Sequence, residues 1–155
     1  MQALAAINAC IETHRSRPME TVHTPYGPVT VARMPGHGNC LFAALAHQMH
    51  GLPPRSSELA AAAAHLRARV VSHIRRHLSR YEMQITESAY ELAPRYSSNP
   101  LPSIIQAYLA DLEKPGFWPG AECVLAASAV LDTGVTVFSD DSTAHVIQAD
   151  PLRPP

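Results

Sequence analysis

Cysteine is scarce in this sequence, where it occurs only at positions 10, 40 and 123. So few thiols, so widely spaced, exclude a disulfide-stapled fold and a zinc ribbon, and they are typical of a reducing compartment. An excess of one charge is also lacking: the formal net charge is −1, which gives no reason to expect a nucleic-acid partner. No apolar run is long enough to span a membrane, and the N-terminus lacks the basic start and long apolar stretch of a signal peptide. We therefore predict a cytoplasmic protein without a membrane partner.

The residues that are present predict one globular domain over 1–155. Hydrophobic residues make up 46% and charged residues 16%, a balance that gives a buried core without a disordered bulk. The 14 prolines cluster outside the periodic segments. The last residues, "ADPLRPP", have the composition of a loop that leaves a strand, so we expect the chain to stop before the last strand of its fold.

The first third of the chain predicts two helices separated by β structure. Apolar residues at helical spacing predict a helix over 3–13. Alternating residues around a Pro-Tyr-Gly-Pro turn predict a short strand or a small hairpin within 21–34. Residues 40–50 then predict a helix that ends before Gly51, a residue suited to a left-handed C-cap.

A long amphipathic helix is predicted next. Ser56 or Ser57 caps it, and its apolar stripe runs on to Leu78. Five arginines are assigned to the side away from that stripe, so we expect them on a solvated face. They are Arg67, Arg69, Arg75, Arg76 and Arg80.

The rest of the chain predicts further helices and two late strands. Residues 82–102 are less periodic and predict a loop with a helical turn. Residues 104–112 and the stretch after Pro119 predict two helices, and "VTVFS" and "AHVIQ" predict two strands. The predicted fold class is therefore α+β, with a small sheet flanked by helices.

Cys40 is the cysteine whose surroundings favour chemistry. It follows a turn in which two glycines bracket His37, and it opens a predicted helix. Unpaired amides and the dipole at a helix N-terminus favour a thiolate, and glycines let backbone amides approach a substrate carbonyl. The alternative is a buried structural thiol, because free cysteine is common in protein cores.

The stretch "MPGHGNCLFAALAHQMHG" resembles the cysteine motif of the ovarian-tumour (OTU) family of deubiquitinating cysteine proteases, with the motif proper at 36–42. A block at 117–139 is similar to that family's second conserved block, since it has an aromatic residue and a glycine, a glutamate that opens a helix, and a strand of the Ile-x-Val-Phe type. The resemblance covers roughly residues 26–150 and implies the papain-like fold of OTU domains. Similar domains occur in viral, mobile-element and bacterial-effector proteins.

The resemblance also implies roles for individual residues. Cys40 matches the nucleophile, and the amides from Gly38 through Asn39 to Cys40 match the oxyanion hole. Glu122 and Trp118 match positions that shape the fold near the site.

A cysteine protease of this kind also needs a general base, an imidazole within hydrogen-bond reach of the thiol. His37 stands where the family normally has aspartate, and it lies only three residues from Cys40 around a tight turn, an unusual geometry for a base. His145 is the histidine that follows the second block, but the family's histidine lies on a later strand. We therefore keep His145 as a candidate base but favour a catalytic histidine beyond the chain, with His145 as an ordinary strand residue.

Two histidine pairs have spacings that could bind a metal, His47 with His50 and His73 with His77. No acidic or cysteine partner accompanies either pair in the sequence. We therefore expect solvated helix faces there, with no metal site and no cofactor.

The resemblance implies a deubiquitinase, a thiol isopeptidase that cleaves ubiquitin or a ubiquitin-like modifier from lysine. The expected partner is then ubiquitin or a ubiquitin-like protein, in the cytoplasm or, for a viral or effector protein, in the host cytosol. Two alternatives stay open. One is a catalytically weak or inactive ubiquitin-binding module, which the missing aspartate and the uncertain histidine favour. The other is a cysteine protease that processes its own polyprotein.

Overall fold

The computed structural model of the chain describes residues 3–4, 19–24, 26–32, 34, 37–92, 100–138 and 144–147. Within these residues it contains five helices and two small sheets, so the α+β prediction is confirmed. The helices are α1 (Cys40–His50), α2 (Ser57–Arg76), α3 (Leu78–Leu92), α4 (Leu101–Leu112) and α5 (Ala121–Leu131). The strands are β1 (Ala3–Leu4), β2 (Met19–Thr24), β3 (Gly27–Ala32), β4 (Val135–Phe138) and β5 (Ala144–Ile147).

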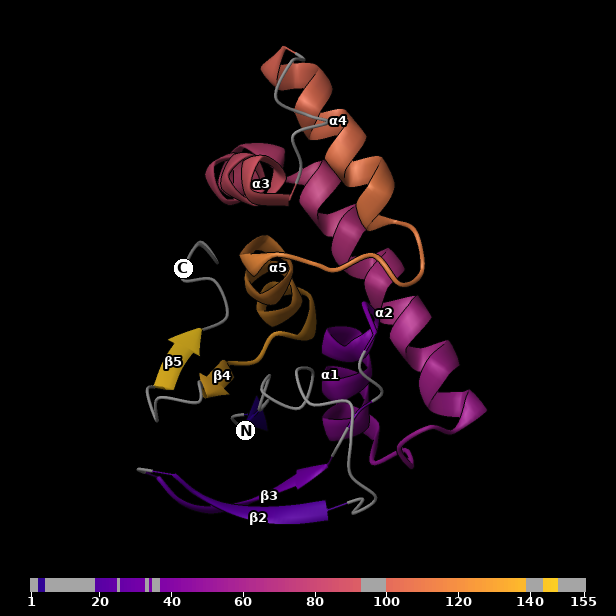
Figure 1. Cartoon of the computed structure of the whole chain (residues 1–155), viewed down its shortest axis with the longest axis vertical. Coiled ribbons are helices and arrows are strands. Elements are labelled where there is room, and N and C mark those ends of the chain that lie inside the picture. Colours follow the sequence, from indigo (N-terminus) through magenta and orange to yellow (C-terminus); the bar gives the residue numbers. More distant parts are fainter. Residues whose placement is uncertain are drawn as a thin grey trace.

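Helix α5 lies near the middle of Figure 1. Helix α2 contacts both α1 and α5, while α3 contacts α4 and α5. Large side chains without exposed surface fill the core, among them Phe42, Leu45, Ile74, Ile85 and Tyr108. Each such burial contributes about 1.5–3 kcal/mol, so helix packing is the main source of stability. None of the described helices combines the length and the apolar composition that crossing a bilayer requires.

Helix α1 has the bounds that the sequence predicts. It starts at Cys40 and ends at His50, and Gly51 follows in the left-handed conformation with φ of 64°. The Gly51 N–H donates to the His47 carbonyl at 2.7 Å, which closes the helix end. The residues that follow Cys40 up to Ala46 are all buried, so α1 is a core helix with Cys40 at its edge.

Helix α2 begins as predicted but ends earlier. The Ser56 hydroxyl caps it by accepting the Leu59 N–H at 3.1 Å. The helix ends at Arg76, and His77 leaves the helical conformation with φ of −126° and ψ of 39°. The prediction of one continuous stripe to Leu78 is therefore wrong, because the chain starts a second helix there.

Helix α3 replaces the loop that the sequence predicts after residue 81. Its buried residues are Tyr81, Ile85, Ser88 and Ala89, which is helical spacing. Two of these four are small or polar, so a pattern based on hydrophobicity underestimates the helix. Tertiary contacts with α4 and α5 compensate for this weak local signal.

The larger sheet corrects the predicted N-terminal helix over 3–13. Ala3 and Leu4 form β1, which pairs parallel to Val135 and Thr136 of β4. The rest of that predicted helix, 5–13, lies outside the described residues. Strand β4 offers β1 a hydrogen-bonding edge, and this pairing overrides the local helical pattern. The predicted strands β4 and β5 are confirmed and pair antiparallel.

The predicted hairpin is also confirmed. Strands β2 and β3 pair antiparallel from Met19 opposite Ala32 to Thr24 opposite Gly27. Gly27 has φ of 104°, a conformation that favours glycine in the tight connection. The hairpin lies at one end of the molecule in Figure 1, and its second strand leads toward the turn that precedes Cys40.

Candidate active site

Cys40 opens helix α1 and is only 2% exposed. Its sulfur belongs to a disulfide. A disulfide sulfur cannot attack a carbonyl, because the thiolate is the nucleophile. The structure therefore holds Cys40 in an oxidised and covered state, and chemistry at this residue requires reduction first.

The turn before Cys40 is closed by its own hydrogen bonds. The Cys40 N–H donates to the His37 carbonyl at 2.9 Å, and the Asn39 N–H donates to His37 Nδ1 at 3.2 Å. His37 itself is exposed. Two of the amides that the sequence predicts as oxyanion donors are thus already bonded within the turn.

Arg67 of α2 lies beneath this turn and is only 4% exposed. Its NH2 nitrogen donates to the Gly38 carbonyl at 2.8 Å and to Asn39 Oδ1 at 2.9 Å. The same nitrogen donates to the Phe117 carbonyl at 3.0 Å, and NH1 donates to the Leu112 carbonyl at 2.8 Å. Burial lowers the pKa of the Arg67 guanidinium from its ordinary value, against a smaller opposite effect of the nearby Cys123. The prediction that Arg67 lies on the solvated face is therefore wrong.

The turn also contacts the segment between α4 and α5 directly. Asn39 Oδ1 accepts the Gly116 N–H at 2.9 Å. A Cβ atom on Gly38 would lie 1.9 Å from the Gly116 carbonyl oxygen, so only glycine permits this approach of two backbones. The residue before the nucleophile position is therefore fixed from two sides, by α2 and by the segment that precedes α5.

The position of Arg67 was recoverable from the sequence. It lies four residues after Ala63 and three before Val70, so helical spacing puts it on the buried stripe of α2. The prediction of a solvated face instead assigns Arg67 to the same side of the helix as Arg69, which is exposed. An arginine within an apolar stripe is a signal of a buried polar network, because such a charge needs hydrogen-bond partners in the fold.

A pocket of about 480 Å³ opens beside the turn. Asn39 and Arg67 line it on one side, and Glu113 and Pro115 of the segment after α4 also line it. The remaining lining residues all come from α2: Ala64, Ala68, Ser72 and Arg75. Cys40 is not among the lining residues, so this pocket lies next to the turn rather than over the sulfur.

The second block contributes a buried carboxylate, at Glu122. This residue has no exposed surface, and it accepts hydrogen bonds from the Tyr108 hydroxyl at 2.5 Å and the Ser88 hydroxyl at 2.9 Å. It also accepts the Gly120 N–H at 3.1 Å, at the start of α5. Trp118, in contrast, is 48% exposed. Glu122 thus joins α3, α4 and α5, while Trp118 is available at the surface.

His145 lies in β5, as the sequence predicts, and its backbone stands opposite Val137 of β4. The structure brings Cys40, Gly38 and Asn39 together in one turn with His37.

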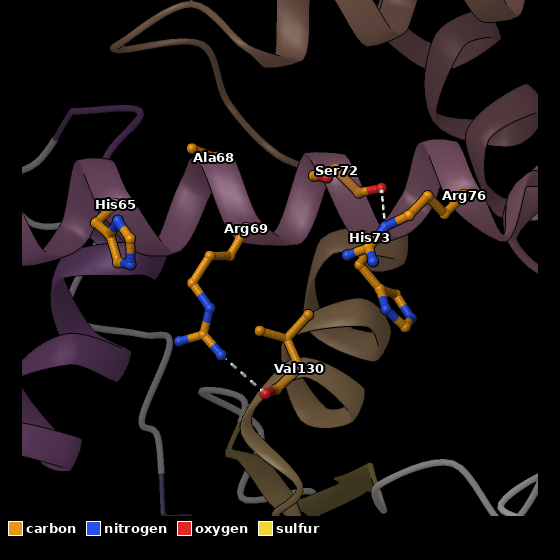
Figure 2. A pocket seen from close by; sticks show the side chains of 7 residues that line it. All are labelled: His65, Ala68, Arg69, Ser72, His73, Arg76 and Val130. Carbon is orange, nitrogen blue, oxygen red and sulfur yellow. Dashed lines mark hydrogen bonds between the residues drawn. The ribbon is translucent and has the colours of Figure 1, made fainter.

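A second pocket, of about 460 Å³, lies along α2 against the end of α5. Figure 2 shows its mainly basic lining, with the Arg69 guanidinium donating to the Val130 carbonyl at 3.3 Å. His73 also lines this pocket, and its ring lies 4.6 Å from that of His77. Among the described residues, no group of three side chains is arranged to hold a metal. None of the lining residues belongs to the Cys40 turn, so we assign this pocket no part in catalysis.

The family model described as OTU-like cysteine protease matches residues 35–151, which include the Cys40 turn, all five helices and the Glu122 block. No curated protein matches the chain closely enough to count as a relative.

Proposed function

The chain belongs to the OTU-like cysteine protease family, and from this premise we propose that it is a deubiquitinase acting in the cytosol. Membership of the family supports a cysteine peptidase. The proposed substrate is ubiquitin or a ubiquitin-like modifier joined to lysine through its C-terminus. The observation that carries the proposal is the match over both the cysteine motif and the second block, with Cys40 at the first residue of a helix.

In the proposed reaction, reduced Cys40 attacks the carbonyl carbon of the isopeptide bond. A histidine accepts the thiol proton and then donates it to the lysine nitrogen as the carbon–nitrogen bond breaks. Water next attacks the thioester, which releases the modifier and restores the thiol. The helix N-terminus favours the thiolate, and amides of the turn would stabilise the oxyanion.

The oxyanion donors require a small change in the turn. Because His37 accepts both the Asn39 and the Cys40 amides, substrate binding would have to draw at least one of them away. His145 of β5 is the proposed base within this chain. If His145→Ala retains the wild-type rate, a different histidine supplies the base.

A ubiquitin probe that carries a C-terminal electrophile tests the proposal. After reduction we expect a covalent adduct on Cys40, none on Cys40→Ser, and an unchanged adduct on Cys123→Ser, because Cys123 is buried. Turnover by Cys40→Ser should fall by about 10⁴-fold or more. The proposal is wrong if the reduced, folded protein forms no adduct while Cys40 reacts with iodoacetamide in the unfolded protein.

A second candidate is a ubiquitin-binding module without turnover. The burial of Cys40, its disulfide and the engaged amides of the turn favour it. The two candidates separate when ubiquitin affinity and turnover are measured on the same reduced sample. Binding at a concentration that gives no hydrolysis indicates the module, while adduct formation and turnover indicate the enzyme.

A further inference from the structure

Arg67 is unusual because it is a buried charge whose hydrogen-bond partners are all neutral. The four acceptors of its guanidinium are three backbone carbonyls and one side-chain amide oxygen. Its guanidinium carbon also lies 4.6 Å from the centre of the Phe42 ring, a cation–π contact with α1. Burying a charge is costly unless such contacts compensate it, and here four hydrogen bonds and the Phe42 ring do so.

The partners of Arg67 come from two segments that are distant in the sequence. Gly38 and Asn39 form the turn before Cys40, whereas Leu112 ends α4 and Phe117 lies in the segment between α4 and α5. Three of the acceptors share the two hydrogens of NH2, and the fourth takes one from NH1. One side chain on α2 thus holds both segments at a fixed distance from each other.

The contact with Gly38 has a direct effect on the next amide. The Gly38 carbonyl and the Asn39 N–H belong to one planar peptide unit and point in opposite directions. When Arg67 binds the carbonyl oxygen, the direction of the Asn39 N–H is fixed as well. In this structure that N–H donates to His37 Nδ1. We propose, on the basis of the proposed function, that Arg67 is a positioning residue that holds the backbone of the Cys40 turn in place, so that its amides can turn from His37 to the oxyanion when substrate binds.

The geometry of the acceptors explains why the residue is arginine. Two ends of a rigid, planar guanidinium donate to two separate sets of oxygens, toward Leu112 on one side and toward the turn on the other. A lysine ammonium is a single point donor and cannot span both sets. Lysine at this position therefore keeps the charge but cannot bind both the Leu112 carbonyl and the turn, so the turn has fewer hydrogen bonds that hold it.

Arg69 provides the matched control for the test. It lies on the same helix two residues later, is exposed, and donates one long bond to Val130. We expect Arg67→Lys to lower kcat on a ubiquitin substrate by about 10²–10³-fold, the loss typical of a removed oxyanion donor, with KM within about twofold. Arg69→Lys should leave both constants unchanged.

A second control separates positioning from stability. Ile104→Ala creates a cavity at a fully buried site near the start of α4, far along that helix from Leu112, and lowers stability without changing the turn. All rates are compared at temperatures where each variant is folded, as judged by circular dichroism. The proposal is overturned if Arg67→Lys loses no more kcat than Ile104→Ala at the same folded fraction.

Two further measurements cover the cases in which Arg67→Lys does not fold or the wild-type protein does not cleave a ubiquitin substrate. If Arg67→Lys does not fold, Asn39→Ala is measured instead, because it removes one acceptor and leaves Arg67 in place. The kcat of Asn39→Ala should fall about tenfold with KM unchanged, and an unchanged kcat overturns the proposal.

If the wild-type protein cleaves no ubiquitin substrate, the proposed function fails, and the iodoacetamide rate of reduced Cys40 at pH 7 decides instead. That rate should fall about tenfold in Arg67→Lys and not in Arg69→Lys, because misdirected amides stabilise the thiolate less; equal rates overturn the positioning role.

Discussion

Among the described residues, two charged side chains of opposite sign are buried, Arg67 under the Cys40 turn and Glu122 under the start of α5. Both have neutral hydrogen-bond partners, and both are almost or fully excluded from solvent. They differ in what they bind. Arg67 mainly binds backbone carbonyls of loops, whereas Glu122 binds hydroxyl groups that project from two other helices.

This difference separates two uses of a buried charge. A loop carbonyl lacks the regular backbone hydrogen bonds of a helix or sheet, so Arg67 determines where the turn and the α4–α5 segment lie. The helices that Glu122 joins are already formed by their own backbone bonds, so Glu122 mainly determines how they pack. We therefore expect changes at Arg67 to alter catalysis more than stability, and changes at Glu122 to do the reverse.

Glu122→Ala should give the largest loss of stability. It leaves the buried Tyr108 and Ser88 hydroxyls without their acceptor and opens a cavity, which together cost about 3–5 kcal/mol. Urea unfolding measures the loss. Glu87→Ala, an exposed glutamate on α3, is the control and should stay within about 0.5 kcal/mol of wild type. The comparison fails if folded Glu122→Ala loses kcat as strongly as Arg67→Lys does.

The sequence predicted those parts of the fold that depend on local signals. Helix α1 has its predicted ends, because Gly51 and the prolines after it act within a few residues. Ser56 caps α2 for the same reason. In contrast, α3 was missed because its buried Ser88 gains a partner only when Glu122 of α5 packs against it.

The candidate site shows the same limit. Cys40 and its turn could be identified from residue order alone, since the motif is continuous in the chain. The partners of Arg67 could not, because Gly38 lies 29 residues from it and Phe117 lies 50 residues from it. Spacing could have indicated that Arg67 is buried, but only the packed fold shows that it binds the turn.

Alkaline pH tests the buried contact between Tyr108 and Glu122. Burial raises the pKa of the Tyr108 hydroxyl, and the neighbouring Glu122 carboxylate raises it further. The folded protein then keeps this proton at a pH where the unfolded chain loses it. The contribution of Tyr108 to the free energy of unfolding is therefore complete below about pH 10 and declines above it. The free energy of unfolding should fall by about 1.4 kcal/mol more for wild type than for Tyr108→Phe between pH 9 and pH 11. Urea titrations at the two pH values measure this difference, and equal losses in both proteins would contradict it.

The smallest effect is expected at Arg75, the exposed counterpart of Arg67 on the same helix. Arg75 pairs with Glu113 at 3.0 Å, but their side chains are 36% and 53% exposed, so water and salt screen the attraction. Arg75→Met should change the free energy of unfolding by no more than about 0.5 kcal/mol and leave kcat unaltered. Glu113 lies in the segment that Arg67 holds through the carbonyls of Leu112 and Phe117. A large loss of kcat in Arg75→Met would therefore mean that the surface pair, and not the buried guanidinium alone, fixes that segment against the Cys40 turn.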